Sequence, residues 1–435
     1  MKMGGHMSLE NGFLMYELAK RLFKIPRSIT GNGVRDTLNI LKETCPLLKI
    51  YETPTGTKVF DWEIPKEWNI RDAWIKDPDG KKIIDFKENN LHVMGYSTPI
   101  QGKIGLDELL AHVYTLPEHP GWIPYVTSYY RERWGFCMSE LQKKSLTARE
   151  YEVIIDSELK DGSLSYGEII IPGEGNFSEK EIFLSTYICH PQMANNELSG
   201  PCVAIWLAKW LQTRQNRYTY RIAFVPETIG AIAYLSRNIE KMKRNVEAGF
   251  VITCVGDTRT FSYLESPYAN TLADRAARNI LESYVPGYKT YSFLERGSDE
   301  RQYCSVGVRL PVCSIMRSKY GEYPEYHTSA DDLELISAEG LEGSFELYKK
   351  ILLALENNHK YKVRCPCEPQ LGKRGLYPTL SMKGSAATVR DMMNFIAYAD
   401  GENDLIAISD ITGISVAKLA EIAENLVKSE LLMYT

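Results

Sequence analysis

Between residues 181 and 356, short apolar runs alternate with segments of helical length. The apolar runs are EIFLSTYICH, YRIAFVP, AGFVITCVG and VRLPVCSIM, and segments such as SGPCVAIWLAKWLQTR and GAIAYLSRNIEKMK lie between them. This alternation predicts a mainly parallel sheet with helices on both faces. The runs are apolar throughout, as expected of strands that are covered on both sides. We therefore predict an α/β fold for this part of the chain.

Side chains suited to catalysis follow these runs. His190 ends the first run, Glu227 follows the second, Asp257 follows the third, and His327 comes soon after the fourth. In an open α/β sheet, ligands bind outside the carboxyl ends of the strands. Imidazole and carboxylate are the donors that a hydrolytic zinc uses, with one position left for water. Each residue alone has an ordinary structural explanation, so their shared position at one edge is what favours a site.

The segments outside this region predict further elements. Apolar spacing predicts a helix at 12–24 and a second helix at about 34–46. Residues 62–145 are rich in aromatic and turn-forming residues, which indicates a separate β-rich module inserted into the chain. Residues 151–159 resume strand-like patterning and are expected in the main sheet. Towards the C-terminus, three short helical segments, with a Gly-containing turn before the last, predict a helix-turn-helix.

Composition narrows the class of protein. A chain of 435 residues suits two or three domains. The net charge of −5 gives no electrostatic case for binding nucleic acid or an anionic membrane. No apolar run approaches the ~20 residues of a membrane span, and the N-terminus lacks a signal-peptide pattern. Nine scattered cysteines, an odd number, favour reduced thiols and a cytoplasmic protein.

Four segments resemble, in order, the zinc-dependent aminopeptidase superfamily. STYICHPQMANNELSGPCVAIWLAKWL resembles a strand ending in a His ligand, then a loop with a metal-bridging Asp ahead of a Ser-Gly that opens a helix. AFVPETIGAIAYL resembles the strand that ends in a Glu-Glu pair, and RGSDERQYCSVGVRLPV resembles a Ser-Asp segment. EYHTSADDLELI resembles the segment of the last His ligand. The resemblance implies a zinc-exopeptidase-like fold and hydrolysis of a peptide or amide bond.

YYRERWGFC, GSDERQYC and YPEYHTS are similar to a narrower bacterial group of aminopeptidase-like proteins, often associated with polysaccharide biosynthesis. In that group the catalytic domain carries an inserted β-rich module and a C-terminal winged helix. The resemblance therefore implies a discontinuous catalytic domain at 8–61 and 146–365. It places the inserted module at 62–145 and a winged helix-turn-helix domain at 366–435.

The resemblance also implies metal positions at His190, Asn196 and His327. This sequence departs from the two-zinc pattern, because Asn196 stands at the bridging Asp position and a single acid, Glu227, replaces the Glu-Glu pair. Cys254 stands near a later Asp position. With those charges lost, two cations ~3.5–4 Å apart are hard to neutralise. We predict one zinc, held by His190, His327 and a carboxylate or water, and leave Glu227 open as ligand or general base.

Further residues are expected around this centre. Guanidinium groups bind carboxylates in a bidentate manner, so Arg301 and Arg317 are candidates for anchoring an acidic part of the substrate. The alternative for each is a structural ion pair with a nearby Glu. The predicted substrate contacts are Arg301, Arg317 and Tyr326. Asp299 and Asp331 are predicted to lie behind the metal ligands.

The helix-turn-helix region is acidic. Residues 380–435 contain four Lys or Arg and eight Asp or Glu, a net charge of −4. Phosphate neutralisation supplies most non-specific DNA affinity, so nucleic acid is not expected as a partner. A packing or dimerisation role is preferred, which allows a homo-oligomer, and the stripe of Leu419, Ile422 and Leu426 is expected to form the core of the domain itself.

The predicted function is a zinc-dependent hydrolase, aminopeptidase-like, that cleaves a small peptide or amide substrate with metal-activated water. The alternative is a catalytically degenerate protein that binds a ligand or regulates, using its winged helix for protein or DNA contacts. Asn196 and Thr228, which replace metal-binding acids, motivate this alternative.

Overall fold

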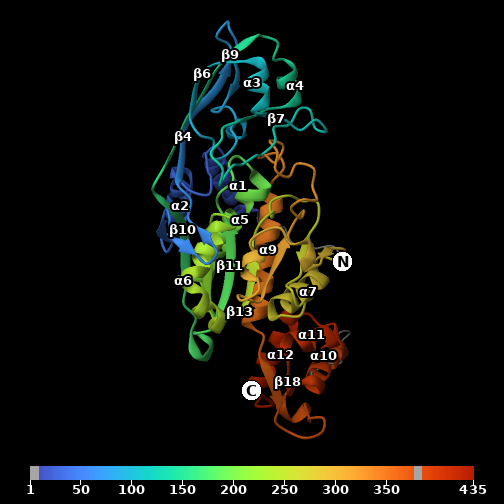
Figure 1. The fold of residues 1–435 in the computed structure, drawn as a ribbon. Helices are drawn as coiled ribbons and strands as arrows, with labels where there is room; N and C mark the ends of the chain where they lie inside the picture. Colours follow the sequence, from blue (N-terminus) through green and yellow to red (C-terminus); the bar gives the residue numbers. More distant parts are fainter. Residues whose placement is uncertain (1–8, 377–384) are drawn as a thin grey trace. The chain divides into compact units, whose positions relative to one another are not determined.

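The structure, a computed structural model, describes residues 9–376 and 385–435. These residues form two compact units, and Figure 1 labels their elements. Of the described residues, the first unit comprises 9–273 and 289–346, and the second comprises 274–288, 347–376 and 385–435. Within the described ranges, no helix combines the length and the apolar character needed to cross a bilayer.

An eight-stranded mixed sheet organises the first unit, in the order β1-β10-β12-β11-β13-β16-β14-β15. Strands β12, β11, β13 and β16 run parallel at its centre, whereas β1, β10 and β14 pair in antiparallel fashion. This confirms the predicted α/β class with a mostly parallel sheet. The strands are β1 (Lys49–Pro54), β10 (Ser163–Ile171), β11 (Glu181–Tyr187), β12 (Thr219–Val225), β13 (Val246–Val251), β14 (Ser262–Leu264), β15 (Lys289–Tyr291) and β16 (Val312–Met316).

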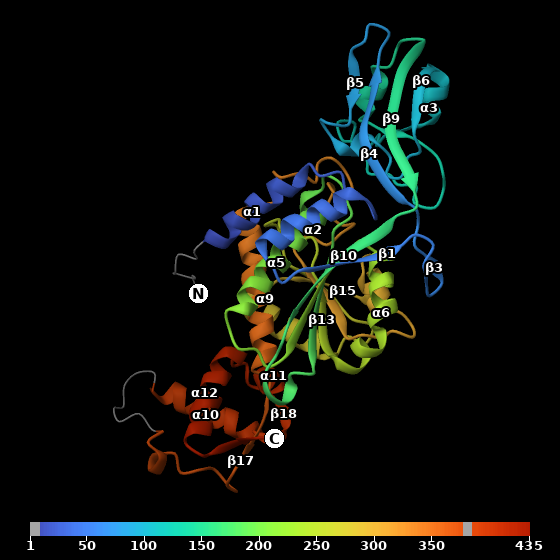
Figure 2. The same ribbon diagram turned by 90° about the vertical axis from the view of Figure 1, so that its left-hand side faces the viewer.

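Helices cover both faces of this sheet, which explains the continuous apolar strands. All seven residues of β11 are buried. Figure 2 shows α5 and α6 on opposite sides of the sheet. At the start of α5, a side chain on Gly200 would lie 2.3 Å from the Ile252 carbonyl oxygen, so only glycine allows this approach. The helices up to residue 356 are α1 (Glu10–Phe23), α2 (Asn32–Thr44), α5 (Ser199–Gln212), α6 (Ile229–Asn245), α7 (Leu272–Tyr284), α8 (Glu300–Tyr303) and α9 (Ala338–Glu356). Most of α7 and the second half of α9 belong to the second unit.

The β-rich module is built on a second, four-stranded sheet in the order β5-β4-β9-β6. Its strands are β4 (Glu67–Lys76), β5 (Lys82–Asp85), β6 (Ile100–Gly105) and β9 (Glu150–Lys160). The expectation that 151–159 belongs to the main sheet is wrong, because β9 pairs with β4 and β6. Buried and more exposed residues alternate along β9, as in an antiparallel strand with one covered face. This sheet therefore extends past residue 145.

Short elements complete the module and the hairpin before it. They are β2 (Lys58–Val59), β3 (Trp62–Glu63), η1 (Asn90–His92), α3 (Leu106–Ala111), β7 (Val113–Tyr114), β8 (Phe136–Cys137) and α4 (Glu140–Lys144).

The second unit contains a winged helix. Helices α10 (Ser385–Tyr398), α11 (Leu405–Thr412) and α12 (Val416–Lys428) accompany a three-stranded sheet of β17 (Lys360–Val363), β18 (Asp400–Asp404) and β19 (Leu432–Tyr434). Gly413, with φ of 68°, ends α11, and Ser415 caps α12. Leu419, Ile422 and Leu426 are buried, which confirms their expected core role.

Candidate functional site

His190 lies just beyond the carboxyl end of β11, on a segment that continues to pair with β12 through Ile188. Its side chain is only 4% exposed. The Nδ1 atom donates to Glu197 Oε2 at 2.9 Å, and the Nε2 atom lies 3.6 Å from Glu227 Oε2. Because a carboxylate accepts at Nδ1, the lone pair of neutral His190 is at Nε2, facing Glu227.

A buried arginine supports this histidine. Arg27 Nε donates to the His190 carbonyl at 2.9 Å and lies 3.7 Å from Glu197 Oε1. The side chains of Arg27 and Glu197 are both fully buried, so each charge depends on the other. Burial lowers the pKa of His190, but the hydrogen bond to Glu197 and its charge outweigh burial and leave the pKa raised.

Sequence reasoning missed this support. Glu197 lies inside the motif that was singled out, one residue after Asn196. Its position in a polar loop that leads into a helix was the only available signal, and nothing in the sequence pointed to Arg27.

His327 and Glu227 complete the centre. The rings of His190 and His327 lie 5.3 Å apart between centroids. The Nε2 atom of His327 is buried and has no hydrogen-bond partner among the described residues. Burial, and then the charge of His190, lower the pKa of His327 to about 3, so its imidazole is neutral at pH 7. Burial raises the pKa of Glu227, against the opposing charges of His190 and Arg301.

These three residues line a cavity of about 400 Å³ in the first unit. Tyr125 contacts both histidine rings, with centroid distances of 5.2 Å to His190 and 5.1 Å to His327. The cavity is lined by Ile29, Trp62, Tyr125, Thr127, Tyr129, Tyr130, Cys189, His190, Glu227, Thr228, Ile229 and His327.

Left-handed backbone recurs around this edge of the sheet: φ is 42° at Gln192, 63° at Thr228, 51° at Cys254 and 58° at His327. This conformation is costly for a β-branched residue such as Thr228 and persists only where the surroundings enforce it. Asp299 Oδ1 accepts from the Thr228 amide at 2.7 Å, and Arg301 donates to Thr228 Oγ1 at 3.1 Å. The two predicted residues Asp299 and Arg301 therefore hold the backbone beside Glu227.

Asp331 organises the loop on the other side of His190. Its carboxylate accepts from the backbone amides of residues 194, 195 and 196 at 3.1, 2.6 and 3.0 Å. It also accepts from the Tyr323 hydroxyl at 2.9 Å. These bonds hold a single π turn, Ala194–Leu198, which carries Glu197. Burial raises the pKa of Asp331 to about 6.

Three other predicted residues do not line the cavity. The Oδ1 atom of Asn196 accepts from the Tyr187 hydroxyl at 2.5 Å, so this side chain is bonded within the core beside the cavity. Arg317 donates to Ser344 Oγ and the Gly340 carbonyl, both at 3.1 Å. Its guanidinium therefore serves the fold. Tyr326 stacks on the His327 ring with centroids 3.9 Å apart.

Two donor sets near His190 were compared for their fit to a metal ion. In the described part of the chain, Cys189, His190 and Glu197 place their ligand atoms within 4.8 Å of one another. This set is a poor fit, because burial raises the pKa of the Cys189 thiol and Arg27 places a positive charge beside Glu197. The cavity set of His190, His327 and Glu227 fits better, because the partnerless imidazole of His327 offers a lone pair.

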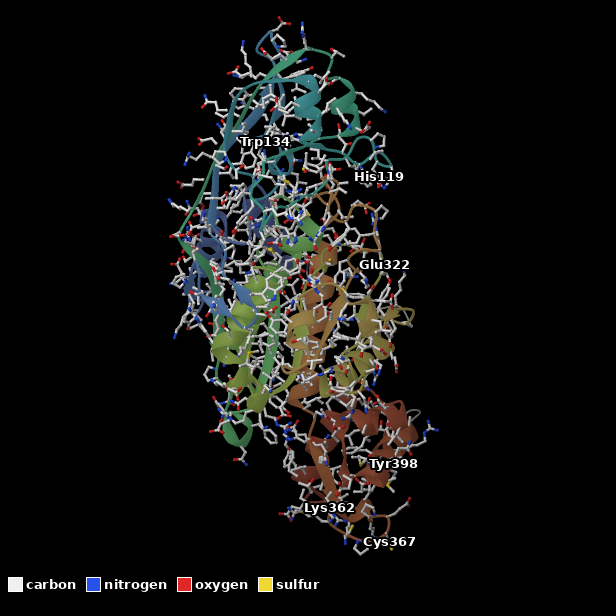
Figure 3. The ribbon with its side chains drawn as sticks, viewed as in Figure 1. His119, Trp134, Glu322, Lys362, Cys367 and Tyr398 are labelled. Atoms are coloured by element: carbon white, nitrogen blue, oxygen red, sulfur yellow. The ribbon has the colours of Figure 1, made fainter. Side chains whose placement is uncertain are left out.

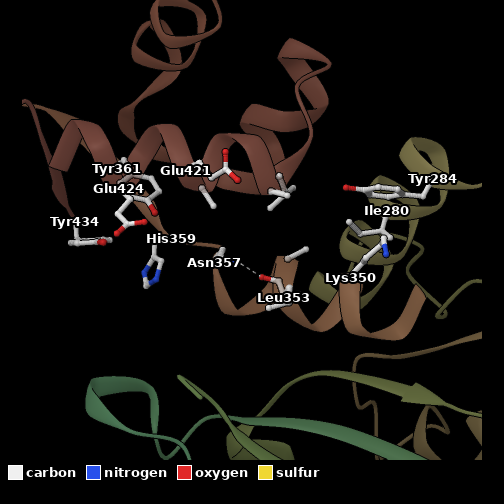
Figure 4. A pocket seen from close by; sticks show the side chains of 14 residues that line it. Ile280, Tyr284, Lys350, Leu353, Asn357, His359, Tyr361, Glu421, Glu424 and Tyr434 are labelled. Atoms are coloured by element: carbon white, nitrogen blue, oxygen red, sulfur yellow. Dashed lines mark hydrogen bonds between the residues drawn. The ribbon is translucent and has the colours of Figure 1, made fainter. Parts of the chain in front are cut away.

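A second cavity, of about 520 Å³, lies in the second unit (Figure 4). Glu421 and Glu424 of α12 face this cavity, and Lys350 and Tyr284 line its other end. No group of three metal-binding side chains was found there among the described residues. The chemistry of the chain therefore concentrates in the first unit.

The fold of the first unit is aminopeptidase-like. A zinc aminopeptidase from Bacillus subtilis has the same fold, with a TM-score of 0.58 at 13% identity over 79% of this chain and 94% of that one. A peptidase M28 precursor from Shewanella amazonensis gives a TM-score of 0.52 at 11% identity over 83% of this chain and 98% of that chain. At these identities the likeness shows the fold alone.

Nearer relatives identify the family. A Clostridium acetobutylicum protein, provisionally named as a polysaccharide biosynthesis protein with an aminopeptidase-like domain, is 45% identical over 98% of this chain and 97% of its own length. A crystal structure of a provisionally named peptidase from that organism gives a TM-score of 0.93 at 43% identity, covering 98% of this chain and 97% of that one. Residues 16–358 match the family "Domain of unknown function (DUF4910)", and 359–434 match a winged helix-turn-helix. The chain belongs to the DUF4910 family.

Proposed function

We propose that the cavity around His190, Glu227 and His327 is the active site of a zinc-dependent hydrolase that cleaves a peptide or amide bond. The buried, partnerless Nε2 atom of His327 carries this proposal, because an unpaired polar atom in such a place calls for a ligand. His190 Nε2 and Glu227 Oε2 lie in the same cavity, 3.6 Å apart. One ion held by the two neutral imidazoles would lie beside the acidic Glu227.

The residues of the chain have distinct roles in this proposal. A bound zinc would polarise the scissile carbonyl and lower the pKa of water. Glu197 orients His190, and Asp299 and Arg301 hold the segment that carries Glu227. Glu227 takes a proton from the attacking water and passes it to the leaving nitrogen, a task that suits a carboxyl whose pKa is raised by burial.

The metal content of the purified protein tests the proposal. We expect about one zinc per chain. His327→Ala should weaken zinc binding at least about 10–100-fold, since removing even an outer partner of a ligand has such an effect. His119→Ala is the matched control, because His119 (Figure 3) stacks on Trp122 and does not line the cavity. Equal zinc content in all three proteins, or none in the wild type, would contradict the proposal.

A binding-only role is the second candidate. Two positions that the resemblance gives to metal-binding acids hold the neutral residues Asn196 and Thr228. Asn196 accepts a hydrogen bond from Tyr187 and does not line the cavity. A metal-free protein that binds a ligand in the cavity without turnover would favour this candidate.

We further propose that the winged helix does not bind nucleic acid. Both lysines of α12 are already paired with carboxylates: Lys418 with Asp391, and Lys428 with Glu424 at 2.6 Å. Together with the exposed Glu421, this leaves the helix face without free positive charge. A role in packing or in a homo-oligomer fits better, and the free cysteines suit the cytoplasm.

Fluorescence anisotropy with a random DNA duplex checks this prediction. We expect no binding at 50 mM salt at protein concentrations up to about 10⁻⁴ M, the weak end of non-specific affinity. The variant Glu421→Lys/Glu424→Lys reverses the charge of the face and serves as a positive control. Salt-dependent binding by the wild type would contradict the prediction.

A further inference from the structure

We propose that the substrate is a neutral amide whose acylated nitrogen is attached to a ring, and not a peptide with a free N-terminus. This inference rests on the proposed hydrolase function and names the substrate class of the same cavity. Two independent observations carry it: the distribution of charge in the cavity and the aromatic side chains of its wall.

The described lining of the cavity provides no carboxylate that could pair with a charged amine while Glu227 acts as the base. Of the described residues that line it, Glu227 is the only carboxylate, and none is a lysine or arginine. An ammonium ion taken out of water needs a paired carboxylate. Glu227 cannot pair with that ammonium and also carry the proton of the reaction. Cys254, which stands near a position where the resemblance has an acid, is a fully buried thiol and does not line the cavity. An acylated nitrogen is uncharged and avoids this cost.

Aromatic rings dominate the wall of the cavity. Tyr125 and Tyr129 are joined by a hydrogen bond of 2.8 Å between their hydroxyls. Trp62 and Tyr130 also line the cavity, with centroids 5.9 Å apart and rings inclined at 62°. They come from distant parts of the chain, Trp62 from β3 of the hairpin and Tyr130 from the loop before β8.

Trp62 and Tyr130 remain 40% and 56% exposed, so their rings are free to contact a ligand. Aromatic faces stack on flat rings and on the CH faces of saturated rings, and this contact adds to simple area burial. A cavity of about 400 Å³ suits a ligand with one or two rings. The shared chemistry is therefore a ring that bears an acylamino group, either aromatic or saturated.

The reaction balances without a further reactant. The oxygen of water forms a bond to the acyl carbon, and the bond between that carbon and nitrogen breaks. One proton of water passes through Glu227 to the nitrogen, so the products are a carboxylic acid and a free amine on the ring. Nothing is oxidised or reduced.

Four probes test the inference on the zinc-loaded full-length protein. 4-Nitroacetanilide carries an aromatic ring and N-acetylglucosamine a saturated ring. Leucine 4-nitroanilide adds a free ammonium, and N-acetylethanolamine lacks a ring. We expect kcat/KM for at least one ring-bearing acetamide to exceed the values for leucine 4-nitroanilide and N-acetylethanolamine by tenfold or more. The ring amide with the higher kcat/KM shows whether the ring of the substrate is aromatic or saturated.

Variants connect this preference to the wall of the cavity. Trp62→Ala and Tyr130→Ala should each lower kcat/KM for the preferred ring amide by roughly tenfold, the loss expected for one aromatic contact. They should leave N-acetylethanolamine unaffected. Phe60→Ala is the control, because Phe60 lies beside the same hairpin, is 59% exposed and does not line the cavity.

Binding of the same probes to Glu227→Gln by calorimetry separates the possible failures. Leucine 4-nitroanilide as the best substrate overturns the inference and leaves the hydrolase standing. Failure of both ring amides to be cleaved or bound also overturns it. Absence of zinc and of all turnover removes the hydrolase, whereas selective binding of a ring amide would still support the substrate class.

Discussion

Glu227→Gln is expected to lower turnover by about 10²–10⁴-fold, the usual contribution of a general base. Gln keeps the shape of the side chain but cannot accept the proton from water. The rate on a cleaved amide and the zinc content of the same sample are measured together. Retained zinc with lost turnover identifies Glu227 as the base, whereas loss of both identifies it as a ligand. Turnover within about twofold of the wild type would contradict the mechanism.

The pH dependence of stability provides a control for folding. Burial raises the pKa of Glu227, so between its unfolded and folded pKa values the native state binds more protons than the unfolded state. Stability from this group is therefore lost as the pH rises through that window. In the metal-free state, Glu227→Gln and the wild type should have the same free energy of unfolding at pH values below both pKa values of Glu227. At pH values above both, the variant should be at least as stable as the wild type. Urea midpoints across pH 4–8 check this result.

Arg27→Met is expected to destabilise the first unit by about 3–5 kcal/mol, because it leaves Glu197 as an uncompensated buried charge. Met keeps the apolar stem of Arg27 but supplies no donor to Glu197 or to the His190 carbonyl. Urea unfolding at neutral pH measures the loss. Zinc affinity should fall as well, because Glu197 orients His190.

Two further variants control this prediction. Arg71→Met removes an ion pair with Asp156 in which the side chains are 60% and 38% exposed, and should shift the urea midpoint far less than Arg27→Met. Adding Glu197→Gln to Arg27→Met removes both charges and should recover part of the loss. Equal losses of stability in Arg27→Met and Arg71→Met would show that the buried ion pair contributes no more to stability than the exposed pair.

Much of the fold follows from periodicity alone. The continuous apolar runs predicted buried parallel strands, and β11, β12, β13 and β16 form the centre of the sheet. The same rule placed His190 and Glu227 at one edge, since parallel strands share their carboxyl ends. The strand at 151–159 was assigned to the wrong sheet, because a strand's own pattern shows that one face is buried and does not name its neighbour.

The sequence by itself therefore determined the α/β class, the helix-turn-helix and the approximate place of the two histidines, because these depend on local periodicity and on the ends of strands. The winged helix was implied by the family resemblance. The tertiary structure decided how the site is supported. It brought Arg27 to Glu197, turned the oxygen of Asn196 towards Tyr187, and set Trp62 beside Tyr130. Such contacts join residues that are distant in the chain or already committed to other partners, and the desolvation that gives them their energy exists only once the chain is packed.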